Sequence, residues 1–172
     1  DAFADSKEMV EVFLMPHGVV DRRGAKKFKF KQGSIEFRHV DFAFGPRSVL
    51  QDFSLQIAAR KKIAFVGSSG AGKSTITKLL FRFYDINKGK ILIDGQDIAQ
   101  VTQESLHEQI SLVPQDPILF HRTLLENIRY GCPTATDDDV ITAAKQAHCH
   151  EFISELPEGY GTYVGERGVK LS

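Results

Sequence analysis

The stretch that decides the fold is Lys62-Ile63-Ala64-Phe65-Val66-Gly67-Ser68-Ser69-Gly70-Ala71-Gly72-Lys73-Ser74-Thr75. Its first part, residues 62–66, is short and apolar, as a strand buried inside a parallel sheet is expected to be. The second part, residues 67–75, fits the pattern G-x-x-x-x-G-K-[ST] of phosphate-binding loops. An amphipathic stretch, residues 74–83, then follows at helical spacing. The order of strand, glycine-rich loop and helix predicts the core of a P-loop nucleotide-binding fold.

The chemistry of phosphate binding explains the residue types in this loop. Glycine lets the backbone wrap closely around a polyanion, so that amide groups and the start of the following helix face the phosphates. Lys73 supplies a charge for the terminal phosphates and so contributes to catalysis, and the Ser74 hydroxyl is placed to ligate Mg²⁺. The loop residues expected to contact nucleotide are Gly67, Ser68, Ser69, Gly70, Ala71, Gly72, Lys73, Ser74 and Thr75.

Alternating apolar residues before the loop predict antiparallel strands over residues 35–44 and 49–57, joined by a turn at Gly45-Pro46. After the loop, we expect a strand over residues 91–93 followed by a tight Asp94-Gly95 turn, and another strand over residues 110–113. Further segments are predicted to be helical, namely residues 1–15, 124–130 and 137–147. Together these segments predict an α/β fold, in which parallel strands form the P-loop core and an antiparallel β subdomain precedes it.

Composition and charge narrow the class of protein. With 42% hydrophobic and 26% charged residues among 172, the chain has the composition of a folded domain. The formal net charge is zero, so no overall field favours nucleic acid as a partner. No apolar run approaches the roughly 20 residues of a membrane-spanning helix, so we expect the chain itself to be soluble. The two cysteines, Cys132 and Cys149, are interpreted as free thiols.

Several further segments, taken together, resemble the nucleotide-binding domain of ATP-binding cassette (ABC) transporters. The resemblance is to exporters in which the membrane and ATPase domains share one chain. It covers about residues 34–172, and the segments follow one another in the family's order. They are Ile35-Glu36-Phe37-Arg38-His39-Val40-Asp41-Phe42-Ala43-Phe44, Gly89-Lys90-Ile91-Leu92-Ile93-Asp94-Gly95, Ile110-Ser111-Leu112-Val113-Pro114-Gln115-Asp116-Pro117, Leu156-Pro157-Glu158-Gly159-Tyr160 and Val164-Gly165-Glu166-Arg167-Gly168.

The resemblance implies roles for residues outside the loop. Phe44 matches the position of an aromatic ring that stacks on adenine, where the family usually has tyrosine. Gln115 is expected to approach Mg²⁺ and the γ-phosphate, to contribute to catalysis, and to report the nucleotide state to the membrane domain. Glu166 and Arg167 are expected to meet the membrane domain too. The alternatives are a strand core residue for Phe44, a polar loop residue for Gln115, and a solvated charge pair for Glu166 and Arg167.

The implied function is that of the ATP-binding part of an exporter ATPase, which couples ATP binding and hydrolysis to transport at the cytoplasmic face of a membrane. Residues 1–33 resemble the link from a preceding membrane domain, and residues 34–172 the N-terminal part of the ATPase domain. Leu171-Ser172 matches the start of the family's signature Leu-Ser-Gly-Gly-Gln, which a second ATPase subunit presents across a head-to-tail dimer. We therefore expect an incomplete cassette that binds ATP and Mg²⁺ but does not turn ATP over.

Other interpretations remain open. A soluble P-loop kinase would need a basic lid after residue 80, which the sequence does not show, and a nucleotide-sensing regulator would lack the catalytic Asp-Glu pair that follows the signature. The basic run in residues 21–31 fits either a solvated loop or a segment drawn to anionic lipid. His148-Cys149-His150 is a poor metal site, since neighbouring residues of a helix point in different directions.

Overall fold

The computed structural model describes residues 18–115 and 117–165. The helix predicted over residues 1–15 lies outside the described residues, as do Glu166, Arg167, Leu171 and Ser172. The chain divides into two compact units, Asp1–Leu112 and Val113–Ser172, and each is described by itself.

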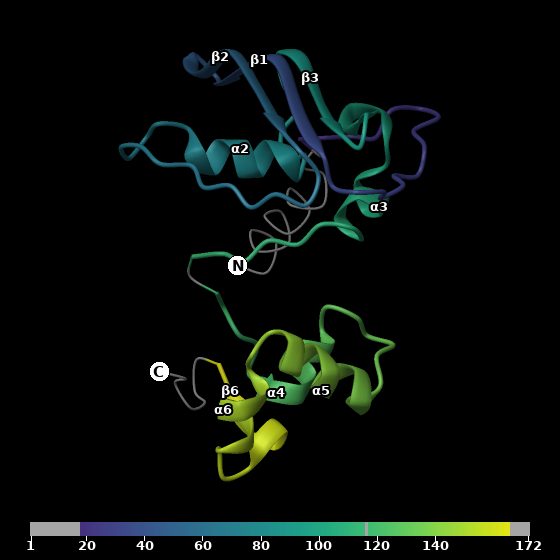
Figure 1. The fold of residues 1–172 in the computed structure, drawn as a ribbon, viewed down its shortest axis with the longest axis vertical. Helices are drawn as coiled ribbons and strands as arrows, with labels where there is room; N and C mark the ends of the chain where they lie inside the picture. The colour runs from purple at the N-terminus through teal and green to yellow at the C-terminus, as the bar shows by residue number, and fades with distance from the viewer. Residues whose placement is uncertain (1–17, 116, 166–172) are drawn as a thin grey trace, which may run out of the picture. The chain divides into compact units, whose positions relative to one another are not determined.

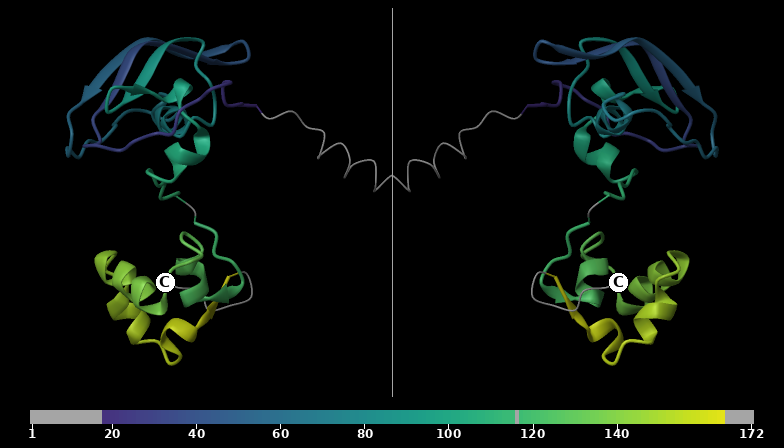
Figure 2. Two further views of the ribbon diagram at one scale, coloured as in Figure 1. Left: turned by 90° about the vertical axis from the view of Figure 1, so that its right-hand side faces the viewer. Right: turned by 90° about the vertical axis from the view of Figure 1, so that its left-hand side faces the viewer.

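The first unit contains a four-stranded antiparallel sheet with the strand order β2-β1-β3-β4. Its strands are β1 (Ile35–Phe44), β2 (Arg47–Ile57), β3 (Lys88–Ile93) and β4 (Gln96–Asp97). The strands predicted over residues 35–44, 49–57 and 91–93 are thus confirmed, and so is the turn at Gly45-Pro46. Figures 1 and 2 show these strands curving over helix α2 (Lys73–Leu80).

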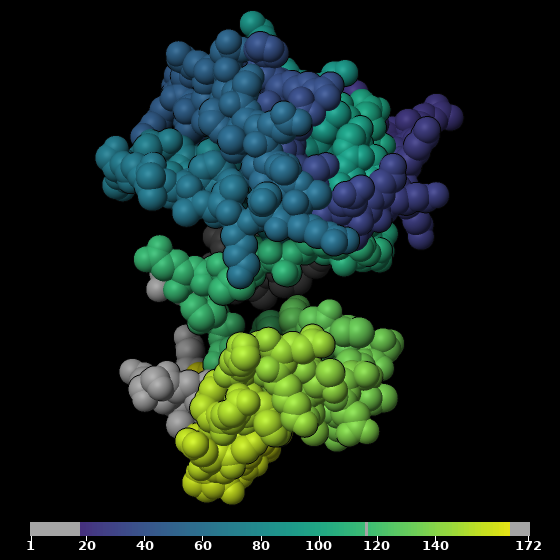
Figure 3. All heavy atoms as spheres, viewed as in Figure 1, coloured from purple at the N-terminus to yellow at the C-terminus, as the bar shows by residue number. Residues whose placement is uncertain are grey.

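The core of this unit lies between the sheet and α2. Strand β1 buries Phe37, Val40 and Phe42. Val40 and Phe42 share a face by the alternation of a strand, whereas Phe37 reaches the same face through a register shift between Phe37 and Val40, which adds one residue to the spacing. Ile76 and Leu79, three residues apart on α2, belong to the same apolar cluster. The blue atoms of β1 and β2 lie at the surface on the face drawn in Figure 3. One face of the hairpin therefore packs on α2, and the other is solvated.

The predicted Asp94-Gly95 turn is confirmed, and its geometry explains the residue types. Asp94 has φ 50° and Gly95 has φ 75°, and Ile93 pairs with Gln96 across the turn. Two consecutive residues with positive φ match the type I′ turn, whose twist suits the right-handed twist of the strands that it joins. Asp-Gly is one of the sequences that favour this turn.

Two predicted strands are not formed. Residues 62–66 and 110–113 have no strand assignment, and several of their apolar side chains are exposed, up to 91% for Val66 and Val113. A strand exists only through hydrogen bonds to a neighbour, and neither segment has such a neighbour within the part of the chain that the structure describes. The two strand predictions are therefore wrong for this structure, because an apolar composition cannot by itself supply the pairing.

The buried Arg82 connects the C-terminal end of α2 to residues that precede the sheet. Its side chain is 2% exposed, and it donates to Asp21 Oδ1 at 2.9 Å and to Asp85 Oδ1 at 3.2 Å. It also donates to the backbone oxygens of Val101, at 2.9 Å, and Val20, at 3.1 Å. Every nitrogen of the guanidinium is thereby satisfied, as a charged group at this depth requires.

Helix α3 (Gln103–His107), which follows the short 3-10 helix η1 (Ile98–Gln100), was not predicted. Its side chains cap the end of α2, since Gln103 Nε2 donates to the backbone oxygen of Arg82 at 2.7 Å. His107 Nε2 lies 2.7 Å from the backbone oxygen of Phe81. The last carbonyl groups of a helix have no partner within the helix, so α3 supplies contacts that α2 cannot make for itself.

The segment before β1 is fastened to the same unit. Phe28 is buried and its backbone N–H donates to Ser105 Oγ at 2.8 Å, while Lys26 forms an isolated parallel bridge with Val101. The Asp94 carboxylate then accepts hydrogen bonds of 2.8 to 3.1 Å from four successive backbone N–H groups. These belong to Lys31, Gln32, Gly33 and Ser34. The carboxylate of the β-turn thus holds the chain just before β1.

The second unit is built on short helices around a small core. Its elements are β5 (Arg122–Thr123), α4 (Leu124–Arg129), α5 (Asp137–Gln146), α6 (His150–Ser154), η2 (Gly159–Gly161) and β6 (Tyr163–Val164). Leu124, Ala144, Ile153 and Val164 form the buried cluster. The helices predicted over residues 124–130 and 137–147 are confirmed to within one residue, whereas α6 was not predicted.

Capping boxes begin both confirmed helices. Thr123 with Glu126 starts α4, and Thr136 with Asp139 starts α5, each pair exchanging side-chain and backbone hydrogen bonds. Asp139 therefore caps the start of α5.

Among the described residues, no helix has both the length and the apolar character needed to cross a bilayer.

Replacing Arg82 tests its structural role. We expect Arg82→Met to lower the free energy of unfolding by about 3 kcal/mol, because it leaves Asp21, Asp85 and two carbonyl oxygens without their buried donor. The matched control is Arg38→Met, since Arg38 is half-exposed and pairs with Glu36 at the surface; it should cost less than about 1 kcal/mol. Urea unfolding measures both, and equal losses would contradict the assignment.

The lowered pKa of Asp94 makes the stability of the folded protein depend on pH. Burial alone raises this pKa, but the N–H groups of Gly33, Gln32, Lys31 and Ser34 outweigh that effect and hold it well below its usual range. A lowered folded-state pKa stabilises the protein above the unfolded pKa of about 3.9, and the gain disappears as pH falls through the folded value. We expect Asp94→Asn to be less stable by about 2 kcal/mol at pH 7.

The measurement compares urea unfolding of wild type and Asp94→Asn between pH 7 and pH 3. Asparagine tolerates positive φ nearly as well as aspartate, so the turn itself is preserved. The stability difference should shrink below about pH 4, while the exposed control Glu108→Gln should show little difference throughout. A difference that stays constant with pH would show that the carboxylate charge is not what holds residues 31–34.

Candidate nucleotide-binding site

The predicted phosphate loop leads directly into α2. Gly67, Gly70 and Gly72 have φ values of 155°, 83° and 85°, all in the range that favours glycine. Gly72 is the N-cap residue in the left-handed conformation, and no side chain caps the helix there. The N–H groups of the first helical turn have no partner within the helix, and the helix dipole is positive at this end. The loop can therefore receive an anion through its backbone.

The side chains around this helix start differ in exposure. Lys73 Nζ donates to the backbone oxygens of Gly67 and Ser68, each at 2.7 Å, so its ammonium group lies beside the loop backbone. Ser74 is exposed at the helix start, and Thr75 is buried. A hydroxyl at Ser74 and an ammonium at Lys73 are thus both next to the backbone amides, which fits the donor set needed for a metal-bound triphosphate.

The base of the loop rests on the hairpin formed by β1 and β2. A Cβ atom at Gly72 would lie 3.4 Å from Val49 Cγ1 and 3.5 Å from Leu50 Cδ2. The loop backbone at Gly72 therefore lies within one Cβ atom's reach of β2, and its φ of 85° disfavours any residue but glycine. This contact places the loop beside the start of β2 and hence beside the Gly45-Pro46 turn.

Phe44 lies at the end of β1 next to that turn, in a cluster of three aromatic rings. Its ring centroid is 4.8 Å from that of Phe42 and 5.0 Å from that of Tyr84, with interplanar angles of 85° and 89°. Phe42 is buried, whereas Phe44 is 37% exposed and Tyr84 is 40% exposed. Edge-to-face contacts are a favoured arrangement of aromatic pairs. The cluster therefore fixes the Phe44 ring while leaving part of it open to solvent.

Tyr84 was missed by reasoning from the sequence. It belongs to the run Phe81-Arg82-Phe83-Tyr84 at the end of the helix, and this density of aromatic residues was its only signal. Asn87, three residues after Tyr84, makes two hydrogen bonds to β1. Its side-chain Oδ1 accepts from the backbone N–H of Ala43 at 2.9 Å, and its backbone N–H donates to the backbone oxygen of Asp41 at 2.9 Å. The segment after α2 therefore holds the end of β1 that carries Phe44.

One predicted site residue, Gln115, belongs to the other unit of the chain. Gln115 is exposed in a bend of the second unit, Val113–Ser172, and not in the unit that carries the loop. Farther along, Asn127 orders residues 120–123, accepting from the Phe120 N–H at 2.9 Å and donating to the Thr123 oxygen at 2.9 Å. In the same unit, His150 Nδ1 lies 2.9 Å from the Tyr160 hydroxyl.

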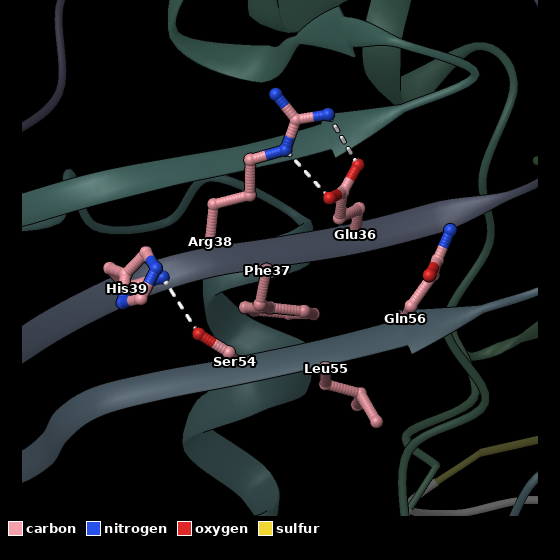
Figure 4. Close-up of a pocket in the computed structure, with 7 residues that line it drawn as sticks. All are labelled: Glu36, Phe37, Arg38, His39, Ser54, Leu55 and Gln56. Atoms are coloured by element: carbon pink, nitrogen blue, oxygen red, sulfur yellow. Dashed lines mark hydrogen bonds and ion pairs between the residues drawn. The ribbon is translucent and has the colours of Figure 1, made fainter.

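A separate hollow of about 410 Å³ lies on the hairpin and is lined in part by Glu36, Arg38, His39 and Ser54. Figure 4 shows Glu36 and Arg38 side by side on β1, joined by two hydrogen bonds of 2.6 and 2.7 Å. The hydrogen bond from Arg38 lowers the pKa of Glu36. Because these charges already neutralise one another, the hollow is a poor site for a polyphosphate.

The chain is similar to known proteins over most of its length. The sequence model of the ABC transporter family matches residues 50–172. Human "ATP-binding cassette sub-family B member 6" is 51% identical over 171 residues, which is 99% of this chain and 20% of that protein. The "Heavy metal tolerance protein" of Schizosaccharomyces pombe is 46% identical over 173 residues, covering 100% of this chain and 21% of that protein.

A bacterial relative and a solved structure agree with these matches. A putative multidrug export ATP-binding/permease protein of Staphylococcus aureus is 52% identical over 151 residues, or 87% of this chain and 26% of that protein. The structure of a bacterial Atm1-family ABC exporter with ATP bound has a TM-score of 0.89 and 47% identity, covering 99% of this chain and 30% of that one.

The chain spans about a fifth of the length of the first curated relatives that it matches. The P-loop α/β fold predicted from the sequence is confirmed by the family match and by the likeness to the exporter structure. ATP binding is a general property that this family implies. Since the family model covers most of the chain and whole-chain identities lie near one half, this chain belongs to the ABC transporter family.

Proposed function

We propose that these residues form the ATP-binding part of an exporter ATPase, in which ATP binding and hydrolysis are coupled to transport across a membrane. The observation that carries this proposal is the seating of the phosphate loop on the hairpin beside Phe44, through the contact of Gly72 with Val49 and Leu50. The loop offers a site for the phosphates of a nucleotide, and the partly exposed ring of Phe44 offers a surface for its base. The likeness to a putative multidrug export protein and to an Atm1-family exporter disfavours the kinase and regulator alternatives.

In this proposal, residues 67–75 bind the phosphates through backbone N–H groups. Lys73 Nζ exchanges its contacts with the Gly67 and Ser68 oxygens for the terminal phosphates. The Ser74 hydroxyl and Gln115 would hold Mg²⁺, which when bound neutralises charge on the phosphates. Ser74 fits that role because it is exposed at the uncapped start of α2. Lys73 and Gln115 are the residues of this chain proposed to contribute to catalysis.

Phe44 is proposed to stack on the adenine ring. Its perpendicular contacts with Phe42 and Tyr84 hold the ring in one orientation, which reduces the entropy lost when a base stacks on it. Stacking uses a ring face that every base possesses, so selectivity for adenine should be weak. We expect ATP and GTP to bind within about tenfold of each other, or 1.4 kcal/mol.

For the whole protein, we propose a head-to-tail partnership with a second ATPase subunit, in which each subunit closes on the other's nucleotide. Gln115, Glu166 and Arg167 would contact the membrane domain, at the cytoplasmic face of the membrane. Residues 1–33 would form the link to that domain. These 172 residues alone are proposed to bind nucleotide without turnover, since in this proposal a second subunit closes each nucleotide site.

Replacing Lys73 tests the phosphate site. We expect Lys73→Ala to weaken ATP binding at least about tenfold, because a charge-assisted contact is worth roughly 1.5–3 kcal/mol. Lys78→Ala, five residues along the same helix and exposed, should bind like wild type. Calorimetric titration with Mg-ATP measures affinity, and a phosphate-release assay measures turnover. An unchanged affinity in Lys73→Ala would contradict the proposal, and turnover abolished by this substitution would show that the chain itself is catalytic.

Replacing Phe44 tests the base site. We expect Phe44→Ala to weaken ATP and GTP by similar factors, corresponding to about 1–3 kcal/mol of lost stacking. Phe44→Tyr should retain affinity, since the ring face is kept. Phe30→Ala removes an exposed phenylalanine from the segment before β1 and serves as the control. If Phe44→Ala binds both nucleotides as wild type does, the ring is a structural residue of β1.

A further inference from the structure

Arg47 is the cross-strand partner of Phe44. The two residues pair in the antiparallel register of β1 and β2, with only Gly45 and Pro46 between them. Directly paired residues of an antiparallel sheet have side chains on the same face, with Cβ atoms about 5 Å apart. The aromatic ring proposed to hold the base and the Arg47 side chain therefore leave the hairpin in the same direction.

The guanidinium of Arg47 lies beside the phosphate loop. Its Nη2 atom is 3.9 Å from the position that a Cβ atom of Gly70 would occupy. Gly70 is in the middle of the loop, where φ is 83° and backbone N–H groups are expected to face phosphate oxygens. At the hairpin turn, β1 therefore ends with the Phe44 ring, and β2 begins with the Arg47 guanidinium, which lies next to the phosphate loop.

This cation has no acidic partner among residues 18–115 and 117–165. Over the same residues, Arg38, Arg82 and Arg129 pair with carboxylates, whereas Arg22, Arg23, Arg60 and Arg122 also have no described ion pair. The position of Arg47 beside the loop, together with its lack of an acidic partner, is therefore what points to a ligand. Arg47 is exposed and makes no described side-chain hydrogen bond. An unneutralised guanidinium next to a loop that receives anions through its backbone favours phosphate as the missing partner, since guanidinium binds phosphate with two parallel hydrogen bonds.

We propose that Arg47 is a second cation of the nucleotide site, which binds the polyphosphate from the hairpin while Lys73 binds it from the helix. The inference rests on the proposed nucleotide binding and adds a residue to it. The hairpin would then contact both ends of the ligand, the base through Phe44 and the phosphates through Arg47. Because the contact is ionic, it contributes to affinity for any nucleotide with several phosphates and does not select the base.

The test is a charge series at position 47 in the 172-residue chain. ATP, ADP and neutral adenosine are measured by competition against a fluorescent ATP analogue. We expect Arg47→Gln to weaken ATP and ADP about tenfold, Arg47→Lys to lose less, and Arg47→Glu to lose more. Adenosine should change less than about twofold in all three, since it has no phosphate. Raising the salt concentration should weaken ATP binding less in Arg47→Gln than in wild type.

The matched control is Arg38→Gln, which removes the same charge from β1 at a residue already paired with Glu36. It should bind ATP as wild type does. The inference is overturned if Arg47→Gln leaves ATP affinity unchanged while Lys73→Ala abolishes it. It is also overturned if ATP and adenosine weaken equally, because Arg47 would then act by holding Phe44. Absence of ATP binding in the wild-type chain would instead overturn the proposed function, and the inference with it.

Discussion

The site depends on one packing constraint, the direct contact of the loop backbone at Gly72 with the hairpin. A Cβ atom at this position would lie in van der Waals contact with Val49 and Leu50, at 3.4 and 3.5 Å, and the residue would also adopt a φ of 85°, which is unfavourable for any residue but glycine. The same residue ends the loop and begins α2, so it sets both where the helix starts and how the helix lies under the sheet. The loop, the hairpin turn and the helix N-terminus are therefore brought together by a single close approach of backbone to side chains.

The other end of α2 is held by a different kind of interaction. There Arg82 is buried and bonded to Asp21 and Asp85, while Gln103 and His107 of α3 contact the last carbonyl groups. These contacts join the helix to the chain before β1, whose later part is fastened by Asp94. A helix fixed at its C-terminal end by charges and at its N-terminal end by packing has little freedom to shift along its axis. That rigidity suits a phosphate site, because amide dipoles recognise an anion only when they are already oriented.

Much of this arrangement was predictable from local sequence. Alternation identified β1 and β2, Asp94-Gly95 identified the tight turn, and the glycine pattern located the start of α2. Residues 62–66 and 110–113 show the limit, because composition indicates a tendency to form strands whereas strand formation requires a partner elsewhere. Arg82, Tyr84 and Arg47 could not have been assigned roles, since each role comes from contacts between segments tens of residues apart or across a turn. In the site itself, the motif predicted the phosphate residues, but only the fold shows what surrounds them.

The two ends of the proposed site recognise a ligand by different physical means, and this has a consequence for selectivity. Backbone N–H groups and cations respond to phosphate charge, which all nucleoside triphosphates share, and a ring face responds to the area of any base. Neither reads the donor and acceptor pattern that distinguishes adenine from guanine. Next to Phe44 lie the aromatic rings of Phe42 and Tyr84. The side-chain oxygen of Asn87 already accepts a hydrogen bond from the Ala43 N–H, so it is not free to bind a base edge. A site of this kind distinguishes a triphosphate from ligands with fewer phosphates, but it distinguishes one base from another only weakly. Preference for ATP in a cell would then follow from the abundance of ATP more than from selection by these residues.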